Sequence, residues 1–313
     1  MHDSVFIMGP TGVGKTDILN SLNVGSSLFV INVDSVQIYK DLQIGSAKPT
    51  PFQISNLDYH LLSKLDLSES YSAANFYKDC AQILDKSNHL SCPPFFVGGT
   101  GLYFRVLEQG FSPIPNIPKG VRGMVEEEMN EMGLPWLYDK LKKIDTKLAS
   151  TVHSHDKQRI IRGLEVFEAT GRPLSSFRSA DKKVPLVHCP LKIVIYEPDK
   201  NQLYKKISRR FDQMIEFGLV NEVKSLLLRN PNVIHSPGLK TIGYLQVVKY
   251  LTGVVSFSEM RREAIKESKQ LAKRQMTWLK KEKNAIWVES CSINDAIAKI
   301  VVVLSNYEVK DMR

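Results

Sequence analysis

The sequence has few cysteines and no long apolar segment. Its four cysteines, Cys80, Cys92, Cys189 and Cys291, are scattered and form no Cys-x-x-Cys pair, which argues against a zinc site or a disulfide framework. No uninterrupted apolar run approaches the ~18 residues that a transmembrane helix needs. The first residues also lack the basic segment of a secretory signal. We therefore expect a soluble protein of the reducing cytoplasm.

The basic charge of the chain is unevenly distributed. The protein has 313 residues, 43% hydrophobic and 24% charged, which is typical of one large globular domain or two ordinary ones. Residues 1–112 contain 7 Lys/Arg and 10 Asp/Glu, whereas residues 113–313 contain 35 and 23. This excess favours a polyanionic partner, nucleic acid before membrane because no lipid anchor is visible. A solvated basic surface would account for the same charge.

The first third of the chain predicts a parallel α/β core. Short apolar segments at Val5–Met8, Leu28–Val33 and Phe95–Val97 are typical of buried strands. Helices are expected over Lys15–Leu22 and Ser72–Lys86. Such alternation implies parallel pairing with helices on both faces of the sheet, and functional loops at the carboxyl ends of the strands.

A helical block interrupts this core. Prolines at 113, 115 and 118 predict a stiff connector over Phe111–Pro118, and residues 119–177 have a helical pattern throughout. A strand over Leu191–Tyr196 then resumes the core, and helices and a last strand at Ala285–Val288 follow. We therefore divide the chain into residues 1–115, the first part of a P-loop core; 116–188, an all-helical insertion; and 189–313, the remaining core with basic C-terminal helices.

A phosphate-binding loop is the strongest local signal. The residues Gly9, Pro10, Thr11, Gly12, Val13, Gly14, Lys15 and Thr16 fit the pattern G-x-x-x-x-G-K-[ST] between a predicted strand and a predicted helix. Backbone N–H groups would converge on phosphate oxygens, the Lys15 ammonium would meet the terminal phosphates, and the Thr16 hydroxyl would reach a Mg²⁺. Taken alone, the loop favours a nucleotide triphosphatase or kinase.

Two residues at the ends of further predicted strands, Asp34 and Thr100, each have more than one possible role. Asp34 ends the second strand and would suit a magnesium-holding carboxylate, a general base or a helix N-cap. Thr100 follows two glycines that allow a substrate to approach the backbone, but it would equally serve as the cap of a strand-to-helix turn. Spacing alone does not choose among these alternatives.

Six ordered segments together resemble the bacterial tRNA dimethylallyltransferases, the IPP transferase family. They cover the chain from Gly9 to about Trp287, and their combination is far more specific than a P-loop. They are GPTGVGKT (9–16), VDSVQIYKDLQIGSAKP (33–49), YHLL…ESYSAANF (59–76), VGGTGLYF (97–104), HDKQRIIRGLEVF (155–167) and LAKRQMTWL (271–279).

The resemblance implies an enzyme that transfers a group instead of hydrolysing a nucleotide. Such an enzyme moves the dimethylallyl group of dimethylallyl diphosphate to N6 of adenosine 37 in tRNA and releases diphosphate. The P-loop, with Lys15 and a Mg²⁺ supported by Thr16, would then stabilise the leaving diphosphate. By the same resemblance, Asp34 is the general base, Thr100 lies near the reacting atoms, and Arg210 adds positive charge at the diphosphate.

The same resemblance implies binding of the tRNA anticodon stem-loop by a monomer that does not contact a membrane. Three departures from the family pattern, Ser46, Ser154 and Lys269, affect local contacts more than the chemistry. The positions that match tRNA contacts are Asp34, Ser35, Val36, Gln37, Thr100, Arg122, Gln158, Arg159, Ile160, Ile161, Arg162, Lys273 and Arg274.

Two other functions remain open at this point. One is a P-loop kinase that acts on a nucleotide or small metabolite, and the other is an RNA-binding switch that uses a bound nucleotide as a signal. Both would bind ATP or GTP tightly, whereas a dimethylallyltransferase would prefer an allylic diphosphate.

Overall fold

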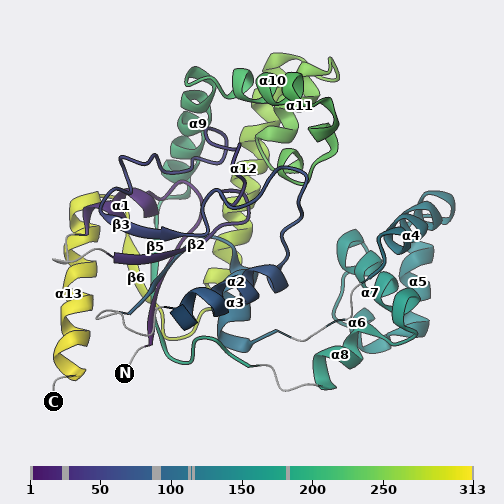
Figure 1. Cartoon of the computed structure of the whole chain (residues 1–313), viewed down its shortest axis with the longest axis horizontal. Coiled ribbons are helices and arrows are strands. Elements are labelled where there is room, and N and C mark those ends of the chain that lie inside the picture. The colour runs from purple at the N-terminus through teal and green to yellow at the C-terminus, as the bar shows by residue number, and fades with distance from the viewer. Residues whose placement is uncertain are drawn as a thin grey trace. The chain divides into compact units, whose positions relative to one another are not determined.

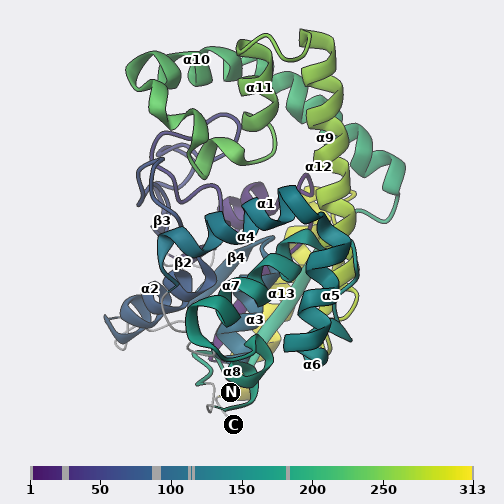
Figure 2. The same cartoon turned by 90° about the vertical axis from the view of Figure 1, so that its right-hand side faces the viewer.

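The computed structural model describes residues 3–22, 28–86, 93–111, 114, 117–180 and 184–311. The chain forms two compact units (Figures 1 and 2). The larger unit comprises Met1–Glu108 together with Leu186–Arg313, and the smaller unit comprises Gln109–Pro185. The smaller unit is therefore inserted into the larger one, and each is described here by itself.

A parallel sheet forms the centre of the larger unit. Within the described residues it has six strands in the order β3-β2-β4-β1-β5-β6, and every pairing is parallel, which confirms the expected α/β class. Gly98 at the end of β4 pairs with Met8 of β1 and with Val33 of β2. The loops that follow these three strands consequently emerge side by side at one edge. The strands are β1 (Ser4–Met8), β2 (Leu28–Val33), β3 (Leu57–His60), β4 (Phe95–Gly98), β5 (Pro190–Tyr196) and β6 (Ile286–Glu289).

Helices cover both faces of the sheet, because successive strand residues point to opposite sides. On one face Ile7 shares an apolar core with Ile18 of α1 and Ile300 of α13. On the other face the ring of Phe6 lies 5.0 Å from that of Phe104 in α3. Figure 1 shows α13 beside the strands on the side opposite α2 and α3. These helices are α1 (Lys15–Ser21), α2 (Ala73–Lys86), α3 (Gly101–Gln109) and α13 (Ile293–Asp311).

A second group of helices lies between β5 and β6 in the sequence. Ile207 of α9 and Ala272 of α12 join the same apolar core as Val13 of the phosphate loop, so both helices reach that edge of the sheet. The long helix α12 begins at a capping box in which Ser256 and Glu259 satisfy each other's backbone N–H groups. The helices are α9 (Lys200–Glu216), α10 (Leu219–Arg229), η1 (Pro231–His235), η2 (Gly238–Lys240), α11 (Tyr244–Leu251) and α12 (Phe257–Leu279).

The smaller unit is helical and has its own core. Leu137, Leu141, Ile160 and Leu164 are fully buried in this core. Asp156 is the N-cap of helix α7, and its carboxylate accepts a hydrogen bond from the Arg159 amide at 3.2 Å. The helices are α4 (Lys119–Met132), α5 (Leu134–Ile144), α6 (Thr146–Ala149), α7 (Lys157–Thr170) and α8 (Leu174–Ala180).

Some features of the fold have a weak or untestable sequence signal. Strand β3, Leu57–His60, was not expected, because it is short, polar and only partly buried at the edge of the sheet. Residues 112, 113, 115 and 116 of the expected proline connector and Cys92 lie outside the described residues. Among the described helices, none combines the length and apolar character that crossing a bilayer requires.

Candidate active site

The phosphate loop turns from β1 into α1 through two glycines with left-handed backbone. Gly12 and Gly14 have φ angles of +88° and +84°, a conformation that other residues rarely adopt. No side chain caps the start of α1, which leaves its first N–H groups available to an anion. The Lys15 Nζ donates hydrogen bonds to the carbonyl oxygens of Gly9 and Pro10, both at 2.9 Å. The loop thus surrounds its own lysine and presents backbone donors.

Two cations, Lys15 and Arg210, lie at this loop, and nearby negative charge does not compensate for their burial. Burial, followed by repulsion from Arg210, lowers the pKa of Lys15 to about 8, and the Asp34 carboxylate only partly opposes this. Burial also lowers the pKa of Arg210, whose Nη1 lies 3.5 Å from Thr11 Oγ1. An anion bound among these groups would reverse both shifts. The electrostatics therefore favour a polyphosphate ligand.

Asp34 forms a tight turn directly after β2. Its Oδ1 accepts hydrogen bonds from the backbone amides of Val36 at 2.7 Å and Gln37 at 3.2 Å. No helix follows this turn, so the carboxylate does not act as the helix cap considered from the sequence. Among the described residues, no hydrogen bond engages Oδ2. One oxygen therefore fixes the orientation, and the other is free to accept a proton from a ligand.

The turn after β4 is tied to the phosphate loop by Gln275 of α12. The Gln275 Oε1 accepts a hydrogen bond from the Thr11 amide at 2.8 Å, and its Nε2 donates to the Gly99 carbonyl at 3.0 Å. A Cβ at Gly99 would lie 2.5 Å from Gln275 Nε2, so a larger residue there would displace the Gln275 side chain from these hydrogen bonds. The Thr100 amide donates to the Val33 carbonyl at 3.2 Å, which packs this turn against β2.

One pocket of about 600 Å³ brings these segments together within the larger unit. Of the predicted residues, Asp34, Gln37 and Arg210 line it, and so do five residues of the phosphate loop: Thr11, Gly12, Gly14, Lys15 and Thr16. Gly9, Pro10, Val13, Ser35, Val36 and Thr100 are not part of its lining. Phosphate-binding groups and the Asp34 carboxylate consequently face one shared space.

Sequence reasoning missed Lys48, which also lines this pocket. It is only 8% exposed, and its Nζ donates hydrogen bonds to the carbonyl of Lys40 at 3.2 Å and to Ser63 Oγ at 2.9 Å. A third bond goes to the Tyr39 carbonyl. Burial lowers the pKa of Lys48 to about 8. The sequence around Lys48, Ala-Lys-Pro, gives no sign of this burial, because the residues that cover Lys48 are distant in the chain.

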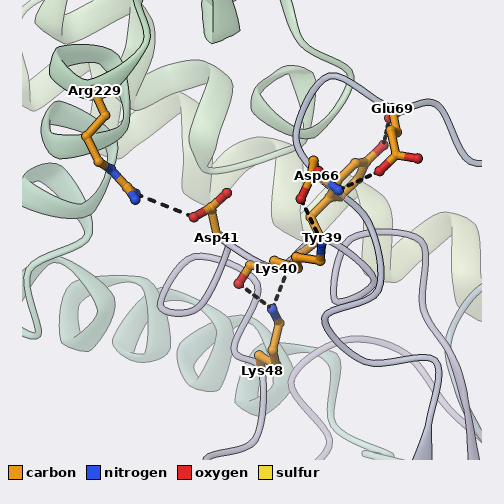
Figure 3. A network of polar contacts seen from close by, with 7 residues as sticks. All are labelled: Tyr39, Lys40, Asp41, Lys48, Asp66, Glu69 and Arg229. Carbon is orange, nitrogen blue, oxygen red and sulfur yellow. Dashed lines mark hydrogen bonds and ion pairs between the residues drawn. The ribbon is translucent and has the colours of Figure 1, made fainter.

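Ion pairs with other parts of the chain also hold residues 40 and 41, whose neighbours bond to Lys48. Figure 3 shows Lys48 reaching the backbone of Tyr39 and Lys40, while Arg229 of α10 reaches Asp41. The Lys40 ammonium pairs with Asp66 at 2.9 Å. These contacts join the chain after Asp34 to two other segments. The pocket wall therefore depends on residues far apart in the sequence.

The helical unit presents basic side chains at its surface. Arg159 is exposed and pairs with Asp156 at 3.2 Å, and Gln158 is exposed beside it. Arg122 and Arg162 both lie near the buried carboxylate of Glu165, at 3.7 and 3.2 Å. Within the same predicted segment, Ile160 and Ile161 are buried in the apolar core, so their side chains support the helix and do not face solvent.

Lys273 and Arg274 are exposed on α12, next to Gln275. The buried side of this helix contains Ala272 and Leu279, and the ring of Trp278 lies 6.1 Å from that of Phe104. An ideal Cβ at Gly101 would lie 2.6 Å from the Trp278 ring, so α12 and the start of α3 approach closely. The basic residues are thus the solvent-facing part of a helix whose other side is packed on the core.

The pocket suits a Mg²⁺ that is held largely by a substrate. The described residues contain no group of three or more His, Cys, Asp or Glu side chains that would hold a metal by itself. Thr16 and Asp34 do offer hydroxyl and carboxylate oxygens to the same space. Protein-bound Mg²⁺ commonly uses one or two such ligands together with waters and substrate phosphates. The donor set therefore fits that ion.

Comparison with known sequences identifies relatives over nearly the whole chain. A tRNA dimethylallyltransferase from Coxiella burnetii is 38% identical over 297 residues, which are 95% of this chain and 95% of that protein. One from Legionella pneumophila is 37% identical over 314 residues, with 98% of this chain and 99% of that protein covered.

Solved structures show the same fold. A full-length tRNA isopentenylpyrophosphate transferase from Bacillus halodurans has a TM-score of 0.70 and 32% identity, covering 98% of this chain and 96% of that one. A eukaryotic dimethylallyltransferase solved while acting on tRNA has a TM-score of 0.80 at 23% identity, covering 99% and 80% of the two chains. Its low identity supports the fold alone.

The family profile described as IPP transferase matches residues 37–282, a span that includes the Gln37 turn, the inserted helical unit and Gln275 of α12. The expectation from the six ordered segments is thereby confirmed. The chain belongs to the IPP transferase family.

Proposed function

We propose that this protein transfers the dimethylallyl group of dimethylallyl diphosphate to N6 of adenosine 37 in the anticodon loop of tRNA and releases diphosphate. One observation supports this proposal most directly: a single pocket is lined by Lys15 and Arg210 on its phosphate-binding side and by Asp34. A hydrolase or kinase also needs the phosphate-binding side. The carboxylate beside it, with one free oxygen, suits the acceptance of a proton from an amine nucleophile.

The donor side stabilises the leaving group. When the allylic C–O bond breaks, negative charge grows on the diphosphate oxygen. The backbone N–H groups of the loop, Lys15 and Arg210, which share the pocket, would stabilise that charge. Because both cations are desolvated, they interact more strongly with charge than they would in water. Thr16 would hold a bound Mg²⁺, which neutralises part of the diphosphate charge.

The acceptor side activates the nucleophile. The exocyclic amine of adenine is a weak nucleophile, because its lone pair is delocalised into the ring. We assign Asp34 Oδ2 to accept an N6 hydrogen bond and then its proton as the new N–C bond forms. The bonds of Oδ1 to Val36 and Gln37 keep the carboxylate in this orientation. Thr100 stays a predicted neighbour of the reacting atoms.

The target base must leave its stack before it enters such a pocket. We propose that the exposed side chains of Arg122, Gln158 and Arg159 and the half-buried side chain of Arg162 contact the RNA, with Ile160 and Ile161 holding helix α7 in place. Lys273 and Arg274 of α12 would contact phosphates near the pocket.

The direct test is to incubate the protein with unmodified tRNA, Mg²⁺ and labelled dimethylallyl diphosphate. Label should enter the RNA at adenosine 37, and an adenosine-to-guanosine change at that position should abolish incorporation. A parallel reaction with labelled ATP tests the kinase alternative. Transfer or hydrolysis of the γ-phosphate without any incorporation of the five-carbon group would refute the proposal.

A further inference from the structure

Two side chains of the larger unit that do not line the pocket are hydrogen-bonded to its wall. The Glu222 Oε2 of α10 accepts a hydrogen bond from the Ile44 amide at 2.8 Å. The Tyr244 hydroxyl of α11 accepts one from the Ser46 amide at 3.2 Å and donates one to Glu222 Oε1 at 2.6 Å. The two side chains are therefore linked to each other and to two amides of one loop.

The residue between these two amides is packed just as closely. A Cβ at Gly45 would lie 2.7 Å from two ring carbons of Tyr244 and 2.8 Å from Leu219, so the loop backbone rests directly on the tyrosine ring. Tyr244 is fully buried, and burial together with Glu222 raises its pKa. The hydroxyl therefore keeps its proton and stays a donor to Glu222.

The loop in turn holds Gln37. The Gln37 Nε2 donates hydrogen bonds to the carbonyl oxygens of Ser46 and Ala47, both at 3.2 Å. The Gln37 amide donates to Asp34 Oδ1 at 3.2 Å. A continuous set of contacts thus runs from the Glu222–Tyr244 pair through residues 44–47 to the proposed base.

This loop needs such support. Residues 43–48 form no helix or strand, and Ala47 has a φ of +47°, which is unfavourable for a residue with a Cβ. Gln43, Ile44, Ser46, Ala47 and Lys48 nevertheless all line the pocket. A wall made of irregular backbone keeps its shape only when contacts outside the pocket define it.

We propose that Glu222 and Tyr244 are positioning residues that fix the acceptor side of the pocket through residues 44–47 and Gln37. This inference rests on the proposed function, because it assigns the Asp34–Gln37 side to the adenosine. The pair contacts no residue of the phosphate loop among its described hydrogen bonds. Its loss should therefore impair use of the RNA and leave use of the diphosphate donor intact.

The test compares Tyr244→Phe, Glu222→Gln and Tyr250→Phe, the last a control on the same helix. Tyr244→Phe should lower kcat/KM for an anticodon stem-loop about tenfold to a hundredfold, the range for a small misplacement of reacting groups. The KM for dimethylallyl diphosphate should stay within about twofold of wild type, because the pair makes no described hydrogen bond to the phosphate loop. A general loss of structure would instead change both kcat/KM for the stem-loop and the KM for the donor. Glu222→Gln keeps one acceptor oxygen and should have a smaller effect. Tyr250→Phe should behave as wild type.

A double-mutant cycle with Gln37→Ala tests the route of the effect. If the pair acts through Gln37, adding Tyr244→Phe to Gln37→Ala should cost little more than Gln37→Ala alone. Full additivity of the two changes, or equal losses for donor and RNA in Tyr244→Phe, would overturn the inference.

A second measurement separates this inference from the proposed function. Amide hydrogen exchange at residues 44–47 should accelerate in Tyr244→Phe, while residues 9–16 keep their protection. If the wild type transfers no dimethylallyl group, the proposed function fails, but the exchange data and stem-loop binding still test the pair. Unchanged protection at residues 44–47 would overturn the inference whatever the activity.

Discussion

The side-chain carbonyl of Gln275 accepts a hydrogen bond from the backbone amide of Thr11 at 2.8 Å. The same side chain donates to Gly99, so a residue of the basic helix α12 joins the loop that follows β1 to the turn that follows β4. Its exposed neighbours, Lys273 and Arg274, are proposed RNA contacts. The relationship thus connects helix α12, which carries these proposed RNA contacts, directly with the phosphate loop.

Replacing Gln275 with leucine keeps its volume and removes both hydrogen bonds. The partly buried Thr11 amide would lose its partner, and ~1–3 kcal/mol, the cost of an unsatisfied buried donor, is the upper limit of this effect. We expect kcat/KM to fall roughly tenfold to a hundredfold with a raised KM for dimethylallyl diphosphate. Gln270→Leu on the exposed side of α12 is the matched control. Wild-type kinetics in Gln275→Leu would show that the phosphate loop keeps its shape without this link.

Lys15→Ala removes the cation that lies at the centre of the phosphate loop. Its ammonium should matter most when charge develops on the leaving diphosphate, so we expect transfer to fall by ~10²–10³ or more. Single-turnover rates with saturating tRNA measure this loss. Lys205→Ala, an exposed lysine of α9 that does not line the pocket, should be neutral. Near-normal turnover of Lys15→Ala would contradict the leaving-group role.

The lowered pKa of Lys15 predicts how donor binding depends on pH. In the free protein this pKa is about 8, below its ordinary value of 10.5. The Lys15 ammonium, which we propose binds the diphosphate, is therefore fully present only well below pH 8 and is lost as the pH rises through 8. Donor affinity should fall over that range, and binding at a pH above 8 should take up a proton, because a bound diphosphate raises the pKa of Lys15.

Calorimetry in buffers of different ionisation enthalpy measures this uptake. Lys15→Arg should flatten the profile, because arginine does not titrate there. Lys48, whose pKa is also about 8, is the other candidate, and Lys48→Met separates the two. In the free protein the same shift acts on stability in the opposite sense: the unfolded chain binds more protons between pH 8 and 10.5, so the contribution of Lys15 to stability rises with pH there.

Asp34→Asn should separate the two oxygens of this side chain. Asparagine keeps an oxygen that accepts from Val36 and Gln37, but it cannot take up a proton. We expect tRNA binding to persist and the transfer rate to fall by ~10²–10⁴, as for other general bases. Asp85→Asn, on the exposed side of α2, is the control. An unchanged kcat would mean that Asp34 serves only the turn.

Arg159→Ala tests the assignment of the helical unit to the RNA. The side chain is exposed and its single ion pair is with Asp156 among the described contacts. If it meets a phosphate, binding of tRNA should weaken and the slope of log K against log salt should decrease by about 0.7–0.9. Lys147→Ala, exposed on α6, serves for comparison. A change confined to the KM of the diphosphate would contradict this placement.

The fold was largely predictable because its signals are local. Apolar runs such as Leu28–Val33 and helical periodicity as in Ala73–Lys86 follow from burial of one face or of a whole strand. The strand Leu57–His60 was not predicted, because an edge strand needs neither a long apolar run nor a strict alternation of apolar and polar residues. Its identity as a strand depends on β2, which lies beside it.

The candidate site was predictable only in part. The phosphate loop and Asp34 follow strand ends and carry recognisable chemistry. Lys48, Glu222 and Tyr244 carry no such signal, because a lysine, glutamate or tyrosine in isolation is far more often a surface or core residue. Ile160 and Ile161 show the opposite error. They lie in a segment that matches the family's tRNA contacts, but their side chains are buried.

The motifs and their order by themselves determined the family and the α/β class and indicated the candidate diphosphate-binding groups, because each motif consists of residues close together in the chain. Only the tertiary structure decided which distant residues complete the pocket. Gln275 and Thr11 are 264 positions apart, and Glu222 and Ile44 are 178 apart. A hydrogen bond depends on distance and direction in space, and the packing of the whole sheet and its helices sets both.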